Sequence, residues 1–225
     1  MTWIKICGIT NVEDAQASTE SGADALGFVF HPASPRRVDP DRARAIIETL
    51  PRNIEKIGVF VNERVDEVAR IADQAHLTAV QFHGDEYRDG SQLAVNRRIL
   101  LSLPCSTVVG DDREYRNALL SLTSTAPNLI AIMIDAGTRE RRGGTGTAFD
   151  WSGAAASICA LQKRYPVVVA GGLTPDNVGQ AIGILHPWGV DVSSGVEVRS
   201  GKKDAEKLRA FIRAVRLADG KNGNN

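Results

Sequence analysis

The sequence predicts an α/β protein: a single (β/α)8 TIM barrel, in which eight parallel strands close into one sheet. The chain has 225 residues and 43% hydrophobic content, enough for one large core and typical of a barrel that forms one domain. Short β-branched runs alternate with longer amphipathic segments, the order expected for parallel strands with crossover helices. Eight such pairs can be counted, at about 28 residues each, the compact end of this fold. A doubly wound open sheet is the alternative that the same alternation allows.

The strands are expected at eight short apolar runs. Parallel strands that are covered on both faces are almost continuously hydrophobic, as residues 57–61 and 167–170 are. In chain order, the predicted strands are Trp3–Cys7, Ala25–Phe30, Lys56–Phe60, Ala79–His83, Arg98–Leu103, Leu129–Asp135, Val167–Gly171 and Val190–Ser193.

The helices are expected between these strands, and several would start at Asp, Asn or Pro, which favour helix N-termini. The predicted helices lie near residues 11–20, 40–50, 63–75, 86–95, 112–124, 150–162, 175–185 and 204–218. Thr174-Pro175-Asp176 is the clearest helix start. Residues 220–225 are polar and rich in Gly and Asn, so a disordered tail is expected after a barrel domain that covers residues 1–219.

Composition favours a small-molecule partner. Lys plus Arg and Asp plus Glu both total 27, and no basic block interleaved with aromatics indicates nucleic-acid binding. No apolar run approaches the roughly 18 residues that span a bilayer, and the first residues lack a signal-peptide pattern. The three cysteines form no C-x-x-C pair, so reduced thiols and no metal site are expected. We therefore expect a cytoplasmic protein without membrane contact.

Chemically useful side chains stand at the predicted strand ends, which is where barrels place their working residues. Lys5 and Cys7 end the first strand, Gln81 and His83 the fourth, and Asp135 the sixth. Because side chains alternate along a strand, Lys5 and Cys7 should both point into the barrel, and so should Gln81 and His83.

Glycine-bearing loops follow the last two predicted strands. Without side chains, Gly171 and Gly172 would let backbone N–H groups reach a phosphate, and Ser193, Ser194 and Gly195 would add amide and hydroxyl donors. Either loop alone could simply be a tight turn. Both loops together, at the two positions where barrels hold phosphate, predict a phosphate site.

Six short motifs, taken together, resemble the phosphoribosylanthranilate isomerase family, cofactor-free (β/α)8 enzymes of tryptophan biosynthesis. The pairing of K-I-C-G with a downstream S-P-R is the most specific part, and the resemblance spans residues 5 to about 204. The motifs are K-I-C-G-I-T at 5–10, S-P-R at 34–36, Q-F-H-G at 81–84, G-G-T-G at 143–146 with F-D-W at 149–151, A-G-G-L at 170–173 and S-S-G-V-E at 193–197.

The resemblance implies an Amadori rearrangement of a phosphoribosyl substrate, without a cofactor. An acid must protonate the ribose ring oxygen, and a base must then remove the proton from C2′. Asp135 matches the family's acid, Cys7 its base and Arg36 its contact with the anthranilate carboxylate. A thiol is a weak base unless its thiolate is stabilised, and Lys5 is a candidate stabiliser. Asp135 must carry its proton at ring opening, which burial or the substrate's negative charge would favour.

Gly143 and Gly144 belong to a Gly-rich loop expected to close over the pocket and to contact the substrate. The family commonly has Lys-Thr where this chain has Thr147-Ala148, which puts the contacts of this loop in doubt. The enzymatic alternative is the related sugar-phosphate isomerase of histidine biosynthesis, or a dual-substrate relative, but those barrels resemble one another in having an Asp where this chain has Cys7. A barrel that binds a phosphorylated metabolite without turnover is the non-enzymatic alternative. The sequence leaves a monomer or a homodimer open.

Overall fold

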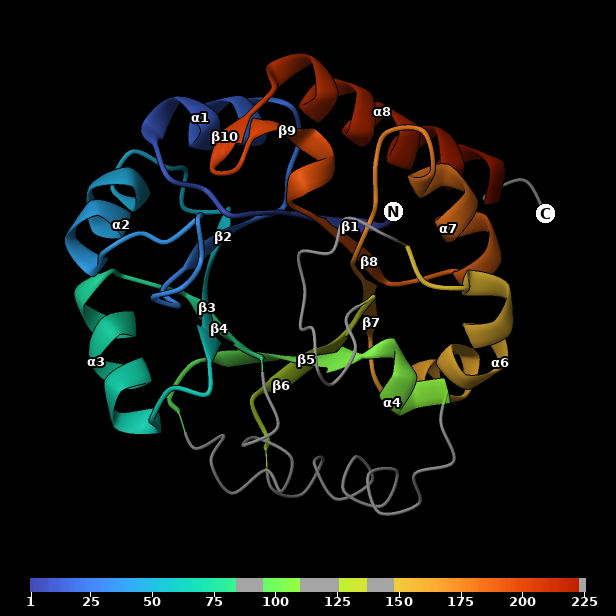
Figure 1. Cartoon of the computed structure of the whole chain (residues 1–225), viewed down its shortest axis with the longest axis horizontal. Coiled ribbons are helices and arrows are strands. Elements are labelled where there is room, and N and C mark those ends of the chain that lie inside the picture. Colours follow the sequence, from blue (N-terminus) through green and yellow to red (C-terminus); the bar gives the residue numbers. More distant parts are fainter. Residues whose placement is uncertain (84–94, 110–125, 137–147, 223–225) are drawn as a thin grey trace.

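The structure, a computed structural model, describes residues 1–83, 95–109, 126–136 and 148–222. At its centre, eight parallel strands form a closed barrel in the order β1-β2-β3-β4-β5-β6-β7-β8, surrounded by helices (Figure 1). The predicted (β/α)8 fold is therefore confirmed.

The strand ends differ from the prediction by at most two residues. β1 pairs with β8 and closes the barrel, with Lys5 directly opposite Asp191. The strands are β1 Trp3–Cys7, β2 Ala25–Val29, β3 Glu55–Val61, β4 Ala79–His83, β5 Arg98–Pro104, β6 Leu129–Asp135, β7 Val167–Val169 and β8 Gly189–Val192.

Most of the observed helices match the expected segments, but a short one, α4, follows β5 without having been predicted. The helices expected near 86–95 and 112–124 fall on segments outside the described residues. The helices are α1 Val12–Glu20, α2 Pro40–Ile47, α3 Val65–Gln74, α4 Cys105–Val109, α6 Trp151–Gln162, α7 Val178–Leu185 and α8 Ala205–Asn222.

The start of α7 was predicted wrongly, because the helix begins at Val178 and not at Thr174-Pro175-Asp176. The Asn177 side chain accepts a hydrogen bond from Thr174 N (2.7 Å) and donates one to Gly172 O (2.9 Å). These bonds hold the segment before Val178 as a turn, since an Asn side chain can take the place of a backbone partner.

Part of the segment expected to be a disordered tail is helical, and the rest of that expectation stays a prediction. Helix α8 continues through Gly220 to Asn222, while residues 223–225 lie outside the described residues. Each residue added to an existing helix contributes a further backbone hydrogen bond. A long helix anchored by buried Leu208, Phe211 and Val215 therefore carries a polar end that composition alone assigns to a tail.

A small hairpin, absent from the prediction, follows β8. A 3-10 turn, η2 Ser194–Val196, leads into β9 Glu197–Arg199, which pairs antiparallel with β10 Lys202–Lys203. Gly201 makes the turn with φ +78°, a left-handed conformation that favours glycine. The hairpin lies beside α1 at the rim of the barrel (Figure 1).

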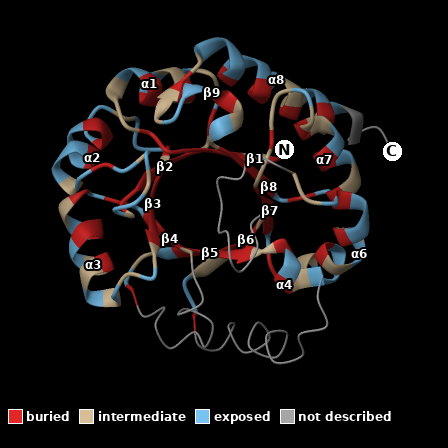
Figure 2. Ribbon diagram, in the orientation of Figure 1, coloured by how far each residue is buried: buried red, intermediate tan, exposed pale blue. Residues whose placement is uncertain are grey.

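The two larger of three apolar clusters in the described part of the chain support the barrel. The larger fills the space between the helices and the sheet, where Figure 2 shows that buried residues follow the strand ring and the inner helix faces. The smaller lies inside the barrel and consists of Ala25, Ile57, Ala79, Leu100, Ala131, Met133, Val168 and Ala170. We call this set the inner layer. Among the described residues, no helix is both long and apolar enough to cross a membrane.

Candidate active site

A cavity of about 710 Å³ opens where the parallel strands end, the position of active sites in this fold. Its volume suits a small ligand. Its wall combines strand-end side chains with the loops after β2, β7 and β8, and includes Cys7, His31, Arg36, Gln81, His83, Asp135, Gly171, Gly172, Asp191, Ser193 and Ser194.

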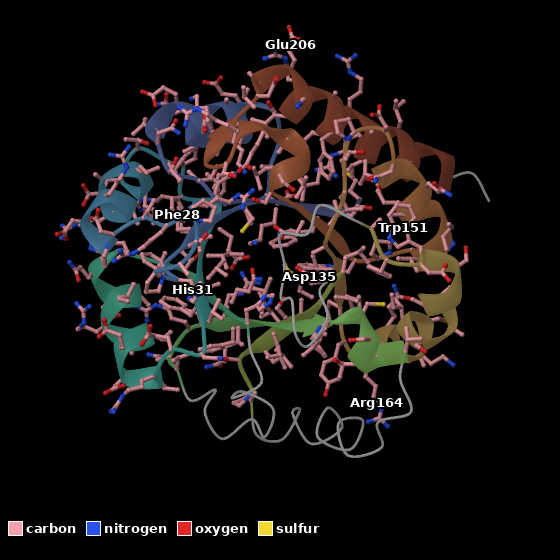
Figure 3. All side chains as sticks on the ribbon, in the orientation of Figure 1. Phe28, His31, Asp135, Trp151, Arg164 and Glu206 are labelled. Atoms are coloured by element: carbon pink, nitrogen blue, oxygen red, sulfur yellow. The ribbon has the colours of Figure 1, made fainter. Side chains whose placement is uncertain are left out.

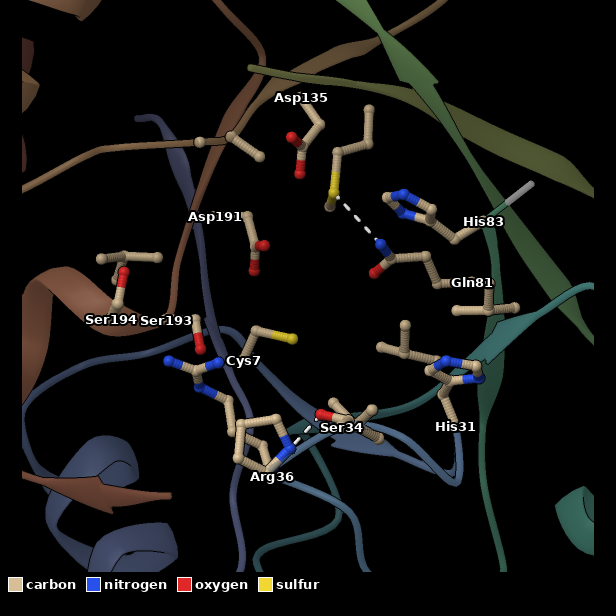
Figure 4. Close-up of a pocket in the computed structure, with 18 of the residues that line it drawn as sticks. Cys7, His31, Ser34, Arg36, Gln81, His83, Asp135, Asp191, Ser193 and Ser194 are labelled. Carbon is tan, nitrogen blue, oxygen red and sulfur yellow. Dashed lines mark hydrogen bonds between the residues drawn. The ribbon is translucent and has the colours of Figure 1, made fainter. Parts of the chain in front are cut away.

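Cys7 and Asp135, the predicted base and acid, both line this cavity. Each is the last residue of its strand, β1 and β6. Figure 4 shows the thiol and the carboxylate directed into the same space from different sides. In Figure 3, Asp135 points toward the barrel centre, whereas Arg164 and Glu206 lie on the outside. The structure thus brings together two groups that are far apart in the sequence.

Lys5 was expected among the substrate-binding residues, but it lies below Cys7, is completely buried and is not among the residues that line the cavity. Its Nζ donates a hydrogen bond of 2.8 Å to Asp191 Oδ1, and no role had been predicted for Asp191. Burial alone would lower the pKa of Lys5, but the charges of Asp191 and Cys7 outweigh burial and raise it. Lys5 is therefore a fixed ammonium at neutral pH.

The Cys7 thiol has a raised pKa, chiefly because it is buried. The charge of Lys5 opposes this rise, as predicted, but the carboxylate of Asp191 adds to it. Lys5 and Asp191 thus act on the thiol in opposite directions. Gly27 on β2 makes room for the group, since a Cβ there would lie 2.8 Å from Cys7 Sγ and 3.1 Å from Lys5 Cε.

Lys203 on the unpredicted hairpin is a second buried cation near Cys7. Its Nζ donates hydrogen bonds to Cys7 O (2.6 Å), Ser193 O (3.2 Å) and Glu197 Oε1 (2.9 Å). Burial lowers the pKa of Lys203, although Glu197 opposes this effect. The charge of Lys203 also favours the Cys7 thiolate.

Arg36 reaches the cavity from the loop after β2. Ser34 Oγ accepts a hydrogen bond from Arg36 N (3.1 Å) and fixes this loop. The guanidinium engages both carboxylate oxygens of Glu197, at 2.9 Å from Nε to Oε1 and 2.7 Å from Nη2 to Oε2. The side chain lies across Gly8, where a Cβ would approach Arg36 Cδ to 2.6 Å. Arg36 is thus in place, but with a protein partner that the sequence did not reveal.

The two glycine loops lie against neighbouring backbone. Gly171 and Gly172 have φ of +85° and +66°, and a Cβ at Gly171 would lie 2.5 Å from Ala136 N. Gly195 is not among the cavity-lining residues. A Cβ there would come within 1.9 Å of Leu173 O, so this glycine lets the two loops touch.

Three further polar side chains line the cavity. Gln81 Nε2 donates to Met133 Sδ at 3.3 Å, and within the described ranges Gln81 Oε1 and Ser193 Oγ have no hydrogen-bond partner. Both residues line the cavity, so these two buried atoms retain a hydrogen-bonding capacity beside it. His83 lies beside Gln81 (Figure 4), as strand alternation predicted. Gly143 and Gly144, which were expected to contact the substrate, lie outside the described residues.

A family model described as N-(5'phosphoribosyl)anthranilate (PRA) isomerase matches residues 4–214. The chain belongs to this family. A relative named N-(5'-phosphoribosyl)anthranilate isomerase from Geotalea uraniireducens is 45% identical over 96% of this chain and 99% of its own length. A namesake from Pelobacter propionicus is 46% identical over 96% of both chains.

Solved structures of the isomerase family share the fold. The phosphoribosyl anthranilate isomerase from Thermotoga maritima has a TM-score of 0.81 and 40% identity, and the match covers 96% of this chain and all of that one. A second structure, solved with reduced 1-(o-carboxyphenylamino)-1-deoxyribulose 5-phosphate, has a TM-score of 0.78 and 37% identity at the same coverage.

Proposed function

We propose that this member of the isomerase family converts N-(5′-phosphoribosyl)anthranilate to 1-(o-carboxyphenylamino)-1-deoxyribulose 5-phosphate, with Asp135 as general acid and Cys7 as general base. The observation that carries these roles is that the two side chains share one cavity. A cavity with a proton donor on one wall and a proton acceptor on another suits a reaction that needs both.

The chemistry needs two proton transfers. Asp135 gives its proton to the ribose ring oxygen, the C1′–O bond breaks, and the electron pair of the anthranilate nitrogen forms the iminium. The Cys7 thiolate then takes the C2′ proton, which yields an enolamine that tautomerises to the ketone. Lys5 and Lys203 favour the thiolate, so the base is supported from inside the barrel and from the hairpin.

Binding orients the substrate between these two groups. The loops that carry Gly171, Gly172, Ser193, Ser194 and Gly195 are assigned to the phosphate. Gly171 and Gly172 have positive φ, and within the described ranges the Ser193 hydroxyl has no hydrogen-bond partner, so both loops have donors to offer. Arg36 is assigned to the anthranilate carboxylate, since a guanidinium binds both oxygens of a carboxylate. Gln81 Oε1 provides an acceptor for a substrate N–H or O–H group. His83 is assigned to the wall of the substrate pocket.

The experiment that tests this function is turnover by purified protein, followed by the loss of anthranilate fluorescence. Turnover of the anthranilate substrate is expected without added metal or cofactor. An aminoimidazole-type substrate should be inert, because the related isomerase of histidine biosynthesis differs at Cys7. Binding without turnover would favour a non-catalytic barrel, and turnover of both substrates would widen the assignment. A cytoplasmic location and a monomeric or homodimeric state stay predictions.

A further inference from the structure

The guanidinium of Arg36 has two edges that can each bind a carboxylate. Glu197 occupies the edge formed by Nε and Nη2. In the part of the chain that the structure describes, no hydrogen bond of Arg36 Nη1 is found, and Arg36 lines the cavity. The second edge, formed by Nη1 and Nη2, is thus available to an anionic group in the pocket.

Glu197 is held firmly enough to fix the orientation of this guanidinium. Its side chain is only 4% exposed, and its carboxylate also accepts hydrogen bonds from Lys203 Nζ (2.9 Å) and Gly201 N (3.3 Å). Lys203 is bound in turn to the carbonyl of Cys7. The hairpin therefore connects the end of β1 with Arg36 through Lys203 and Glu197.

The charges in this group leave room for one more anion. Glu197 lies between two cations, Arg36 and Lys203. Burial alone would raise the pKa of Glu197, but the Arg36 hydrogen bond and the Lys203 charge outweigh burial and lower it. One carboxylate thus lies between two basic side chains, an arrangement that suits a further anion such as a substrate carboxylate.

We propose that Glu197 is a positioning residue: it fixes Arg36 so that the free edge of the guanidinium faces the carboxylate on the anthranilate ring. Glu197 itself does not touch the substrate. This inference rests on the proposed function, because it requires Arg36 to bind that carboxylate. It gives the hairpin after β8 a role in substrate selection, beside the loop assigned to the phosphate.

The test compares two substrates in Glu197→Gln: the anthranilate compound and its aniline counterpart, which lacks only the carboxylate. Gln keeps the size of the side chain but cannot pair with both cations. The KM of the anthranilate substrate should rise about tenfold, because charge-assisted hydrogen bonds are the strong ones. The KM of the aniline substrate should change little, and any change in kcat that arises through Lys203 should be the same for both substrates. Glu206→Gln, on the outer surface of α8 (Figure 3), is the matched control and should behave as wild type.

A double-mutant cycle separates positioning from a merely structural role. In an Arg36→Met background, Glu197→Gln should no longer affect the KM of the anthranilate substrate. Equal rises in the KM of both substrates would overturn the inference, as would a Glu197→Gln effect that persists without Arg36. If Arg36→Met raises the KM of both substrates equally, Arg36 does not bind the anthranilate carboxylate. The inference then fails as well. In that case turnover by the wild type still supports the isomerase function.

If Glu197→Gln does not fold, Glu197→Asp provides the same test. Aspartate keeps the charge between Arg36 and Lys203 but is one methylene shorter, so it cannot keep both contacts. A smaller rise in KM, confined to the anthranilate substrate, is expected. A rise of equal size for the aniline substrate would contradict the proposal.

Discussion

The interior of the barrel has two levels with contrasting chemistry, and β4 and β6 supply residues to both. The inner layer is uniformly apolar and buried, whereas the cavity above it contains Cys7, Gln81, Asp135 and Asp191. On β4, for example, Ala79 belongs to the inner layer and Gln81 to the cavity wall. On this strand, two residues, about 6–7 Å, separate packing from the polar cavity wall, whereas Met133 and Ala170 of the inner layer also line the cavity.

This difference teaches that stability and catalysis have separate sources in the same strands. Apolar burial in the inner layer stabilises the fold. Beneath the thiol, the buried pair of Lys5 and Asp191 contributes little net stability, since desolvation offsets the attraction of the two charges. Substitutions at the two levels should accordingly have different signatures.

The largest expected effect is on catalysis, in Asp135→Asn and Cys7→Ser. Each variant should lower kcat about a thousandfold, because each loses one proton transfer. The thermal unfolding midpoint should stay close to that of the wild type. Steady-state kinetics and calorimetry measure both quantities. Full activity in Asp135→Asn would show that Asp135 is not the general acid.

The next effect is on stability, in Leu100→Ala within the inner layer. Leu100 is fully buried, and truncating such a side chain should lower the free energy of unfolding by about 3 kcal/mol. Turnover per folded molecule should not change. Denaturant titration measures the free energy of unfolding, and activity normalised to folded protein measures turnover. A large fall in kcat would show that the inner layer also affects catalysis.

A smaller effect is expected for Gly171→Ala in the loop assigned to phosphate. The left-handed φ and the 2.5 Å approach to Ala136 N would displace this loop, so KM should rise about tenfold through weakened phosphate contacts. Gly183→Ala on α7 is the matched control, since a Cβ there meets nothing within 4 Å. That control should keep its KM and gain slightly in stability. An unchanged KM in Gly171→Ala would show that this loop does not contribute to substrate binding.

The smallest effect is a shift of the pH profile. The thiolate must form before it can act as a base, so kcat/KM should rise with pH through the pKa of Cys7, which burial raises above its ordinary value. Because Lys5 favours the thiolate and Asp191 disfavours it, Lys5→Met should move this rise to higher pH and Asp191→Asn to lower pH. Shifts in the same direction would contradict the opposed action of the pair.

The sequence predicted the strands and the inward faces well, because both depend on local patterns. Alternation alone placed Lys5 and Cys7 together, and Gln81 with His83. The ion partners could not be predicted in this way. Arg36 and Glu197 are 161 positions apart, and Lys203 and the carbonyl of Cys7 are 196 apart, so only the closure of the barrel brings them together.

The short elements were missed for a different reason. β9 and β10 have three and two residues, too few for a hydrophobic period to be recognised. The early start predicted for α7 failed because the Asn177 side chain favours a turn. One signal for Glu197 was visible, since it closes the S-S-G-V-E motif, but its partner was not.

The most direct test of the central claim is a crystal structure of the chain with reduced 1-(o-carboxyphenylamino)-1-deoxyribulose 5-phosphate. We predict that the phosphate lies on the amides of the loops after β7 and β8, that the carboxylate lies on the free edge of Arg36, and that the sugar carbons lie between Cys7 and Asp135. A ligand bound with its phosphate elsewhere, or with either side chain out of reach of the sugar, would contradict the account.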